Sequence, residues 1–558
     1  MSVIDTRRGQ IFPTLTAAQI AQARRFAAAA PRRFAAGESL FSVGEQAPAY
    51  LILDGEVVIH RRDGRGIGGV VTNHGPGQIT GEIAQLSGQG SLVEARAGKA
   101  GCEALAFDAA HLRALIVGSA ELGEIVMRAL ILRRTALIAD GGVGPVVVGE
   151  RDQPASVRIE GFLARNAHPY SFLDVKSDSC GQALVERLGL NIGDLPLVLC
   201  PDGHVLKNPS DIEVGACLGI TTAFDTEKLF DLAVVGAGPA GLATAVYGAS
   251  EGLSVLVLDS RAFGGQAGAS ARIENYLGFP TGISGLALTA RAFTQAQKFG
   301  AEIGIPVQVE GLDCAAAALR PRESFGVRLN ADRVVRARSV VIASGARYRR
   351  LDIANLKDFE GAGVYYWASP IEAKLCDGDE VAVVGAGNSA GQAVVFLAPR
   401  VRTLHLIVRG ASLEATMSLY LVQRIAALPN VVLHLRTEVD GLVGDAATGL
   451  QGLELRDRDT GAVETRAIRH LFLFIGADPN SGWLAGCPIR LDPKGFVLTG
   501  ESAAPLGGDS RAASPLETST PGVFAIGDVR SGSTKRVAAA VGEGAQVVAS
   551  LHQLLALH

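Results

Sequence analysis

The stretch Val-Val-Gly-Ala-Gly-Pro-Ala-Gly at 234–241 decides the fold of most of this chain, and a similar stretch, Val-Val-Gly-Ala-Gly-Asn-Ser-Ala, follows at 383–390. Each stretch ends a short apolar run and begins a segment with helical character. In such a turn the first glycine makes the tight bend, and the second lets the backbone approach a pyrophosphate. The third small residue lets the helix pack closely on the strand. Two copies in strand–turn–helix context predict a chain that binds two dinucleotides.

The residue that follows the next strand distinguishes the two sites. After the first stretch, the strand at 253–258 is followed by Asp259, roughly 20 residues beyond Gly236, where a carboxylate accepts from a ribose 2′-OH. After the second, the strand at 403–408 is followed by Arg409, whose planar fork suits a 2′-phosphate. The first site therefore fits FAD and the second fits NADPH rather than NADH, which is the pairing of a flavoprotein reductase. The alternative at both positions is an ordinary solvated charge at the end of a strand.

We expect the following residues of these two stretches to contact the cofactors: Gly236, Gly238, Pro239, Ala240 and Gly241 in the first, and Gly385, Gly387, Asn388, Ser389 and Ala390 in the second. Asp259 and Arg409 complete the two nucleotide sites.

Bulk composition narrows the classes of protein. A length of 558 residues predicts several domains. The 52 basic and 56 acidic residues nearly balance, which gives no reason to expect nucleic acid or a membrane surface as partner. No apolar run is long enough for a transmembrane helix, the first ten residues lack a signal-peptide core, and the histidines show no metal-ligand spacing. The seven cysteines include no close pair, so we expect reduced thiols and a cytoplasmic location.

The chain divides into three regions. Residues 1–140 begin with helical stretches and continue as short strands, with a hairpin starting at 50–59 and a long amphipathic pattern at 111–138. After a glycine-rich linker, residues 146–220 predict a small βαβαββ layer with strands at 145–148, 170–175 and 195–200 and helices at 156–166 and 181–188. Residues 221–558 form a large α/β unit.

This last unit resembles the low-molecular-weight thioredoxin reductases. Beside the first fingerprint, the resemblance rests on four further motifs, at 264–266, 273–280, 342–346 and 522–528, and on the helical segment 538–545. It implies that FAD also contacts Gly265, Gln266, Asn275, Ser344, Gly345, Gly527 and Asp528. It further implies a discontinuous FAD domain of residues 228–349 and 471–558, an NADPH domain inserted at 350–470, and a homodimer.

The sequence departs from this family at its dithiol. The family carries a CxxC motif just before the second fingerprint, and here Trp367 and Pro370 stand at the two cysteine positions. The chain has no CxxC elsewhere, and Cys376 has no partner within four residues. Because disulfide exchange needs an attacking thiolate and a second sulfur, no catalytic residue is assigned in this segment. The electron acceptor stays open between a protein disulfide, ferredoxin or flavodoxin, a quinone and oxygen, and the tail at 550–558, which lacks an aromatic residue, counts against ferredoxin.

The predicted NADPH site also departs in part from the pattern of this family. The family has several arginines after the second strand; this chain keeps Arg409, and Glu414 stands where a later arginine is expected. Arg424 either compensates for that loss or is an ordinary surface residue.

The N-terminal region resembles the cyclic-nucleotide-binding domain, on Gly44, Tyr50, 55–57 and 80–88. The resemblance places Glu82 on the ribose 2′-OH. The arginine that pairs with the cyclic phosphate is replaced by Ser91, and losing such a contact costs on the order of 1.5–3 kcal/mol. We therefore expect weak or no binding of cyclic nucleotides, with Arg96 as the only nearby substitute, and a role in interaction instead.

The middle region resembles a thioredoxin or glutaredoxin-like fold, with Pro196 at the place of that fold's cis-proline. No cysteine lies at 149–152, where its CxxC belongs. Cys180 and Cys200 are expected to be small buried apolar residues, and the region is expected to be redox-inactive and to dock on the reductase or a partner.

The sequence thus predicts a multi-domain protein: an N-terminal β-roll with helices, a middle thioredoxin-like α/β layer, and a C-terminal flavoprotein reductase with two Rossmann-like domains. The expected function is hydride transfer from NADPH to FAD and then to an unidentified acceptor. The alternative is a redox- or nucleotide-sensing signalling protein that uses a reductase module.

Overall fold

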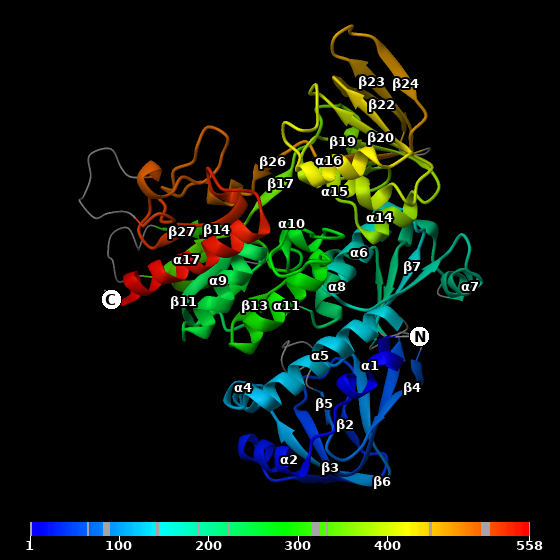
Figure 1. The fold of residues 1–558 in the computed structure, drawn as a ribbon. Helices are drawn as coiled ribbons and strands as arrows, with labels where there is room; N and C mark the ends of the chain where they lie inside the picture. The colour runs from blue at the N-terminus through cyan, green and yellow to red at the C-terminus, as the bar shows by residue number, and fades with distance from the viewer. Residues whose placement is uncertain are drawn as a thin grey trace.

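The computed structural model describes residues 3–63, 66–81, 90–140, 144–187, 189–201, 203–220, 224–314, 324–330, 333–445, 449–503 and 514–556. Figure 1 shows the N-terminal β-roll at the bottom and the middle α/β layer above it on the right. The lobe that holds the first fingerprint lies to the left, and the lobe that holds the second lies at the top.

The N-terminal part is a six-stranded antiparallel roll preceded by two helices. Its elements are α1 (Val3–Ile11), α2 (Ala17–Ala23), β1 (Arg32–Phe34), β2 (Ser39–Phe41), β3 (Ala49–Asp63), β4 (Gly66–His74), β5 (Ile79–Thr80) and β6 (Val93–Phe107). The long strand β3 pairs with both β4 and β6, so the predicted hairpin is present.

The long amphipathic pattern at 111–138 is divided between two helices. These are α4 (Ala109–Gly118) and α5 (Ala120–Asp140), separated at Ser119, whose backbone is extended. The Ser119 hydroxyl accepts from the amide of Leu122 at 3.3 Å and so begins the second helix. Apolar residues of both helices, among them Leu112 and Leu122, pack on Leu51 and Leu105 of the roll.

The middle region is a four-stranded layer in the order β10-β9-β7-β8. Its elements are β7 (Val146–Gly149), α6 (Pro154–Arg165), β8 (Ser171–Asp174), α7 (Ser179–Arg187), β9 (Leu197–Leu199), β10 (Val205–Lys207) and α8 (Asp211–Cys217). Strands β7 and β8 are parallel and β9 is antiparallel to β7. The predicted βαβαββ order is therefore observed, followed by α8, and the Leu195–Pro196 bond is cis.

The first fingerprint lies in a seven-stranded sheet. Its path is β13 (Glu302–Gly304), β12 (Val255–Leu258), β11 (Leu229–Val235), β16 (Val334–Ile342), β15 (Phe325–Leu329) and β14 (Val309–Asp313). Strand β27 (Val523–Ala525), from near the end of the chain, pairs with β16 in parallel. Helices α11 (Gly285–Lys298) and α17 (Val537–Ala556) both pack on α9 (Pro239–Ser250) beside this sheet, around an apolar core that includes Leu232, Val234 and Phe524. The pairing of β27 brings the two predicted segments of the FAD domain into one sheet.

The second fingerprint lies in a five-stranded parallel sheet in the order β18-β25-β19-β20-β21. Its elements are β18 (Val364–Tyr365), α14 (Pro370–Leu375), β19 (Glu380–Val384), α15 (Asn388–Leu397), β20 (Thr403–Val408), α16 (Leu419–Ala426), β21 (Val431–Leu435) and β25 (His470–Leu473). A three-stranded sheet of β22 (Thr437–Asp445), β23 (Gly449–Asp457) and β24 (Val463–Arg466) covers one side. The predicted domain boundary at 470/471 falls within β25, which belongs to this sheet, and the ribbon of β17 (Ala346–Tyr348) and β26 (Ala477–Pro479) links the two lobes.

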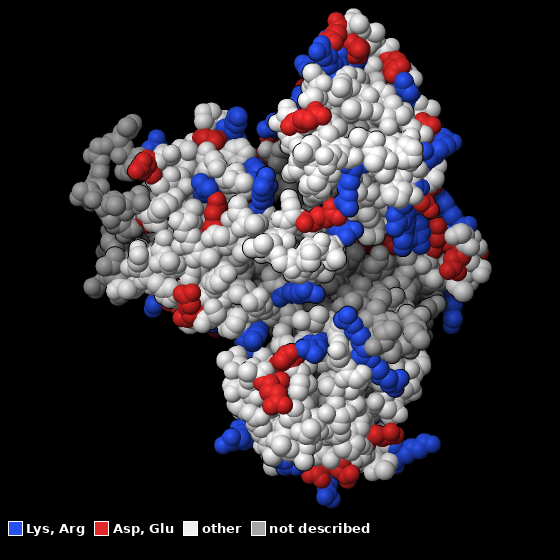
Figure 2. Space-filling view, viewed as in Figure 1, with Lys and Arg blue, Asp and Glu red and all other residues white. Residues whose placement is uncertain are grey.

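The surface carries charges of both signs. On the face shown in Figure 2, lysine and arginine alternate with aspartate and glutamate, and neither sign forms a broad field. Within the part of the chain that the structure describes, no helix has the length and apolar character needed to cross a membrane.

Candidate dinucleotide-binding site

The first fingerprint is a turn that only glycine fits. Gly236 has φ +114°, and a Cβ there would lie 2.2 Å from the carbonyl oxygen of Ala343, which directly follows the neighbouring strand β16. A Cβ on Gly241 would lie 1.9 Å from the carbonyl oxygen of Gly236, so the third glycine lets α9 sit on the turn. Gly238 is the N-cap of α9, and no side chain caps that end. The first amides of α9 are thereby left for an anionic ligand.

The second fingerprint repeats this geometry. Gly385 has φ +141°, and a Cβ there would lie 2.5 Å from the carbonyl oxygen of Phe474. Gly387 is the N-cap of α15, again without a side-chain cap, and open space surrounds the position of its missing Cβ. Ala390 is fully buried beneath the turn. The second helix therefore also presents free first-turn amides.

Both turns face one cavity of about 1140 Å³. Of the predicted cofactor-binding residues, the structure places these on its wall: Gly236, Gly238, Pro239, Ala240, Asp259, Gly265, Gln266, Asn275, Ser344, Gly345, Gly385, Gly387, Asn388, Ser389, Arg409, Gly527 and Asp528. Gly241 and Ala390 lie under their turns instead of on the wall, which suits the packing role of the third small residue.

Asp259 has a structural role that the sequence did not indicate. One carboxylate oxygen accepts from the amide of Ala237 at 2.9 Å, and the other accepts from the amides of Arg261 at 3.0 Å and Ala262 at 3.2 Å. Asp259 thus fastens the fingerprint turn to the loop after β12. Since each carboxylate oxygen has two acceptor sites, it retains capacity for a ribose hydroxyl on the cavity side.

The two arginines considered for a 2′-phosphate lie in different places. Arg409 is exposed at the end of β20 and lines the cavity. Arg424 instead forms an ion pair with Glu274 of the other lobe and lines a neighbouring cavity, so the structure does not support it as a substitute phosphate ligand. The Glu274 carboxylate also raises the pKa of Arg424.

The second FAD motif lies against the first fingerprint, because a Cβ on Gly527 would lie 3.0 Å from the Cβ of Ala240. Asp528 is half-buried on the cavity wall, and burial raises the pKa of its carboxyl while the Lys535 charge lowers it. The turn is held from below by α17, because Glu543 accepts from the amide of Gly527 at 2.6 Å and pairs with Arg530. Lys535 donates to the carbonyl of Asp528 at 2.7 Å.

Comparison with known proteins agrees with this geometry. The family described as pyridine nucleotide-disulphide oxidoreductase matches residues 230–544, which is more than half of the chain. The chain belongs to this family. A second family, the cyclic nucleotide-binding domain, matches residues 31–118.

The relatives are mostly thioredoxin reductases. NADPH-dependent thioredoxin reductase 3 of Arabidopsis thaliana is 31% identical over 340 residues, which cover 59% of this chain and 59% of that protein. Thioredoxin reductase of Ureaplasma parvum is 30% identical over 331 residues, covering 58% of this chain and 96% of the relative. The crystal structure of T. acidophilum thioredoxin reductase superposes with a TM-score of 0.51 at 29% identity, covering 58% of this chain and 98% of that one. This chain thus spans less than two thirds of the Arabidopsis protein.

The family uses FAD and NADPH, and the residues present fit both. The fit rests on the two uncapped helix ends at Gly238 and Gly387, where an added Cβ would meet open space or only a 3.9 Å contact. It also rests on the size of the cavity, which spans both turns.

The segment 367–370, at the position of the family's dithiol, contains no cysteine. Trp367 donates its indole N–H to Glu372 at 2.8 Å, and Ser369 caps α14 in a reciprocal capping box with the same glutamate. Pro370 occupies the first turn of α14, where a missing amide hydrogen is tolerated. Cys376 is fully buried, and this burial raises the pKa of its thiol to about 12. The nearest cysteine is therefore a poor nucleophile.

Two predictions about cysteines are wrong. Cys200 forms a disulfide with Cys217, with a Cα–Cα distance of 6.2 Å, and Cys180 is exposed instead of buried. The pairing arises because α8 folds back beside the end of β9, which the linear separation of the two cysteines conceals. The thiols of Cys314 and Cys487 also lie 3.6 Å apart, although they are far apart in sequence.

The N-terminal roll contains the residues considered for binding a cyclic nucleotide. Glu82 and the rest of the predicted phosphate cassette at 82–89 lie outside the described residues. Ser91 is buried and donates to the carbonyl of Val93, and Arg96 pairs with the buried Glu94, so Arg96 is already engaged.

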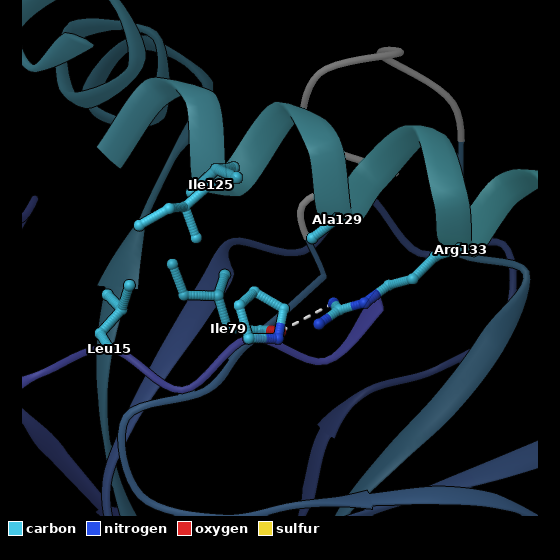
Figure 3. Close-up of a pocket in the computed structure, with 7 residues that line it drawn as sticks. Leu15, Ile79, Ile125, Ala129 and Arg133 are labelled. Carbon is cyan, nitrogen blue, oxygen red and sulfur yellow. Dashed lines mark hydrogen bonds between the residues drawn. The ribbon is translucent and has the colours of Figure 1, made fainter. Parts of the chain in front are cut away.

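The close-up in Figure 3 shows the space under α5, where Arg133 reaches the carbonyl of Ile79. That space measures about 10 Å³, enough for one water at most.

Sequence reasoning missed many of the residues that line the cavity, and three of them show why. Tyr348 belongs to β17 of the ribbon that links the two lobes, Phe474 directly follows β25, and Arg165 comes from the middle region. Each lies outside any recognisable motif, so no sequence signal identified them.

Proposed function

We propose that this chain is an NADPH-dependent FAD oxidoreductase that passes electrons to an acceptor outside its own 367–370 segment. The observation that supports it most directly is the single cavity lined by both fingerprint turns and by Asp528. A cavity shared by two nucleotide sites is what direct hydride transfer between two cofactors requires, since reacting atoms must come within about 3–3.5 Å.

The roles of the residues follow from their positions. The amides that begin α9 hold the FAD diphosphate, Asp259 accepts from the adenosine ribose, and Asp528 contacts the ribitol and diphosphate side. The amides that begin α15 hold the NADPH diphosphate, and Arg409 pairs with its 2′-phosphate. When bound, FAD accepts the hydride and supplies the redox chemistry. The chain itself provides orientation and a protected cavity, and no acid or base is needed for this half-reaction.

The acceptor is inferred from what the segment at 367–370 lacks. A dithiol relay needs two sulfurs within exchange distance, and Trp367 and Pro370 supply neither. Cys376 donates to the carbonyl of Glu372 and is sealed from solvent. Electrons therefore leave to an external disulfide protein, a ferredoxin or flavodoxin, a quinone or oxygen. The match of residues 31–118 to the cyclic nucleotide-binding family is the observation in favour of the second candidate, a sensing protein.

One experiment tests the proposal and separates the candidates. The purified protein is mixed anaerobically with NADPH or NADH, flavin absorbance is followed, and steady-state turnover is then measured with one representative of each acceptor class. We expect bound FAD, faster reduction by NADPH, and turnover with at least one acceptor. A protein that binds no FAD would overturn the proposal, and fast flavin reduction without turnover on any acceptor would favour the sensor.

A further inference from the structure

Arg165, the last residue of α6, extends from the middle region into the dinucleotide cavity. It lines that cavity together with Gly238, Asp259 and Gly265. Its Nη2 donates to the carbonyl of Gly265 at 2.9 Å. Its Nε is buried and has no hydrogen-bond partner among the described residues. The side chain thus joins two domains and still has unused donors.

The surroundings of Arg165 are short of negative charge. Burial and the neighbouring Arg261 lower the pKa of the Arg165 guanidinium, while Asp259 raises it. Asp259 already accepts from three backbone amides. The Nε of Arg261 lies 3.4 Å from a carboxylate oxygen of Asp211, and the Arg261 guanidinium lies over the ring of Trp367. A buried cation with an unsatisfied donor is costly unless an anion completes its environment.

The position of Arg165 identifies the anion. The carbonyl that it contacts belongs to Gly265, and a Cβ on Gly265 would lie 3.0 Å from the Cα of Gly238. Gly238 is the N-cap of α9, where the first fingerprint receives a phosphate group. The guanidinium is therefore next to the diphosphate position, and its planar fork matches phosphate oxygens.

We propose that Arg165 binds the diphosphate of FAD, so that the middle region completes the cofactor site of the reductase. This inference rests on the proposed function in one respect, that the first fingerprint binds FAD. It gives the middle region, which has no CxxC, a direct role in the site.

The contacts between the domains hold Arg165 in place. Asn166 donates to the carbonyl of Arg261 at 3.1 Å, and the Arg261 side chain donates to the carbonyl of Arg158 at 3.4 Å. The end of α6 is thereby fastened to the loop after β12, which also carries Asp259. Arg165 is oriented before the ligand arrives.

The test compares Arg165→Gln with Arg158→Gln in the full chain. Arg158 lies two helical turns earlier on α6, pairs with Asp211, and is not among the residues lining the cavity. Flavin is removed, and FAD affinity is measured by fluorescence titration. We expect Arg165→Gln to weaken FAD binding at least about tenfold, as loss of a charge-assisted contact should. Arg158→Gln should stay within about twofold of wild type.

Competition identifies the part of FAD that is contacted. Arg165→Gln should raise the dissociation constant of ADP, obtained by competition and corrected for the variant's own FAD affinity, and leave that of adenosine unchanged. Arg165→Lys should recover part of the FAD affinity. Equal FAD affinity in Arg165→Gln and wild type, or equal losses in the two glutamine variants, would overturn the inference. Failure of the wild-type protein to bind FAD would instead refute the proposed function on which it rests.

Discussion

The two fingerprint turns have nearly the same backbone and very different surroundings. Around Gly236, the turn is fastened by Asp259, faced by the Gly527–Asp528 motif, and approached by Arg165 from a third domain. Around Gly385, the position beside Gly387 is open and the charged residue, Arg409, is exposed. From this difference we expect the enclosed turn to serve a retained cofactor and the open turn to serve a substrate that exchanges.

Alanine at the first glycine of each turn should have the largest effect, and the result should distinguish the two turns. Gly236→Ala places a Cβ 2.2 Å from the Ala343 carbonyl at a strained φ, so we expect a protein that retains little FAD and unfolds at a lower temperature. Gly385→Ala makes a similar clash with the Phe474 carbonyl, but it should keep FAD and lose reduction by NADPH. Flavin absorbance after desalting and anaerobic reduction rates measure the two outcomes. Loss of FAD in both variants would show that the turns are not independent.

Asp528→Ala tests the enclosed site around Gly236, where we expect FAD to bind. The carboxylate lies on the wall of the cavity that the first turn also lines, so its loss should weaken FAD binding by about tenfold or more and leave the second turn intact. FAD release during gel filtration checks this, with Asp492→Ala as a control aspartate that pairs with Ser531 and is not among the cavity-lining residues. Equal flavin content in the Asp528 and Asp492 variants would contradict the role assigned to Asp528.

Arg409→Ala tests the open site around Gly385, where we expect NADPH to bind. An exposed arginine that pairs with a 2′-phosphate contributes roughly 1–3 kcal/mol, so the preference for NADPH over NADH should narrow by about five- to 150-fold. The ratio of kcat/KM for the two nucleotides is the measurement. Arg424→Ala is the matched control, because Arg424 pairs with Glu274 outside this wall, and it should leave the ratio unchanged. A wild-type protein that prefers NADH would show that Arg409 does not read the 2′-phosphate.

Cys376→Ser should have the smallest effect. The thiol is fully buried, and the upward shift of its pKa to about 12 leaves almost no thiolate at neutral pH. NADPH oxidation with oxidised thioredoxin should be slow in the wild type and unchanged in the variant. Rapid turnover that the substitution abolishes would mean that this side of the molecule carries a dithiol relay after all.

The sequence by itself determined the features that are local. Both fingerprint turns, the strand-end positions of Asp259 and Arg409, and the tryptophan and proline at 367 and 370 follow from short stretches, because a glycine with positive φ or a helix cap is specified by neighbours in sequence. The structure sets the predicted binding residues around one cavity, apart from Gly241 and Ala390, and their roles in binding remain predictions.

Only the tertiary structure decided what comes from distant segments. Arg165 reaches the first turn from another domain, Arg424 forms an ion pair with Glu274, and Cys200 forms a disulfide with Cys217 of α8. These contacts depend on how whole domains dock, and docking is set by the summed packing of many side chains, so no short pattern encodes it. The sequence thus specified where a dinucleotide can bind, and the packing of the domains decided which further charges surround it.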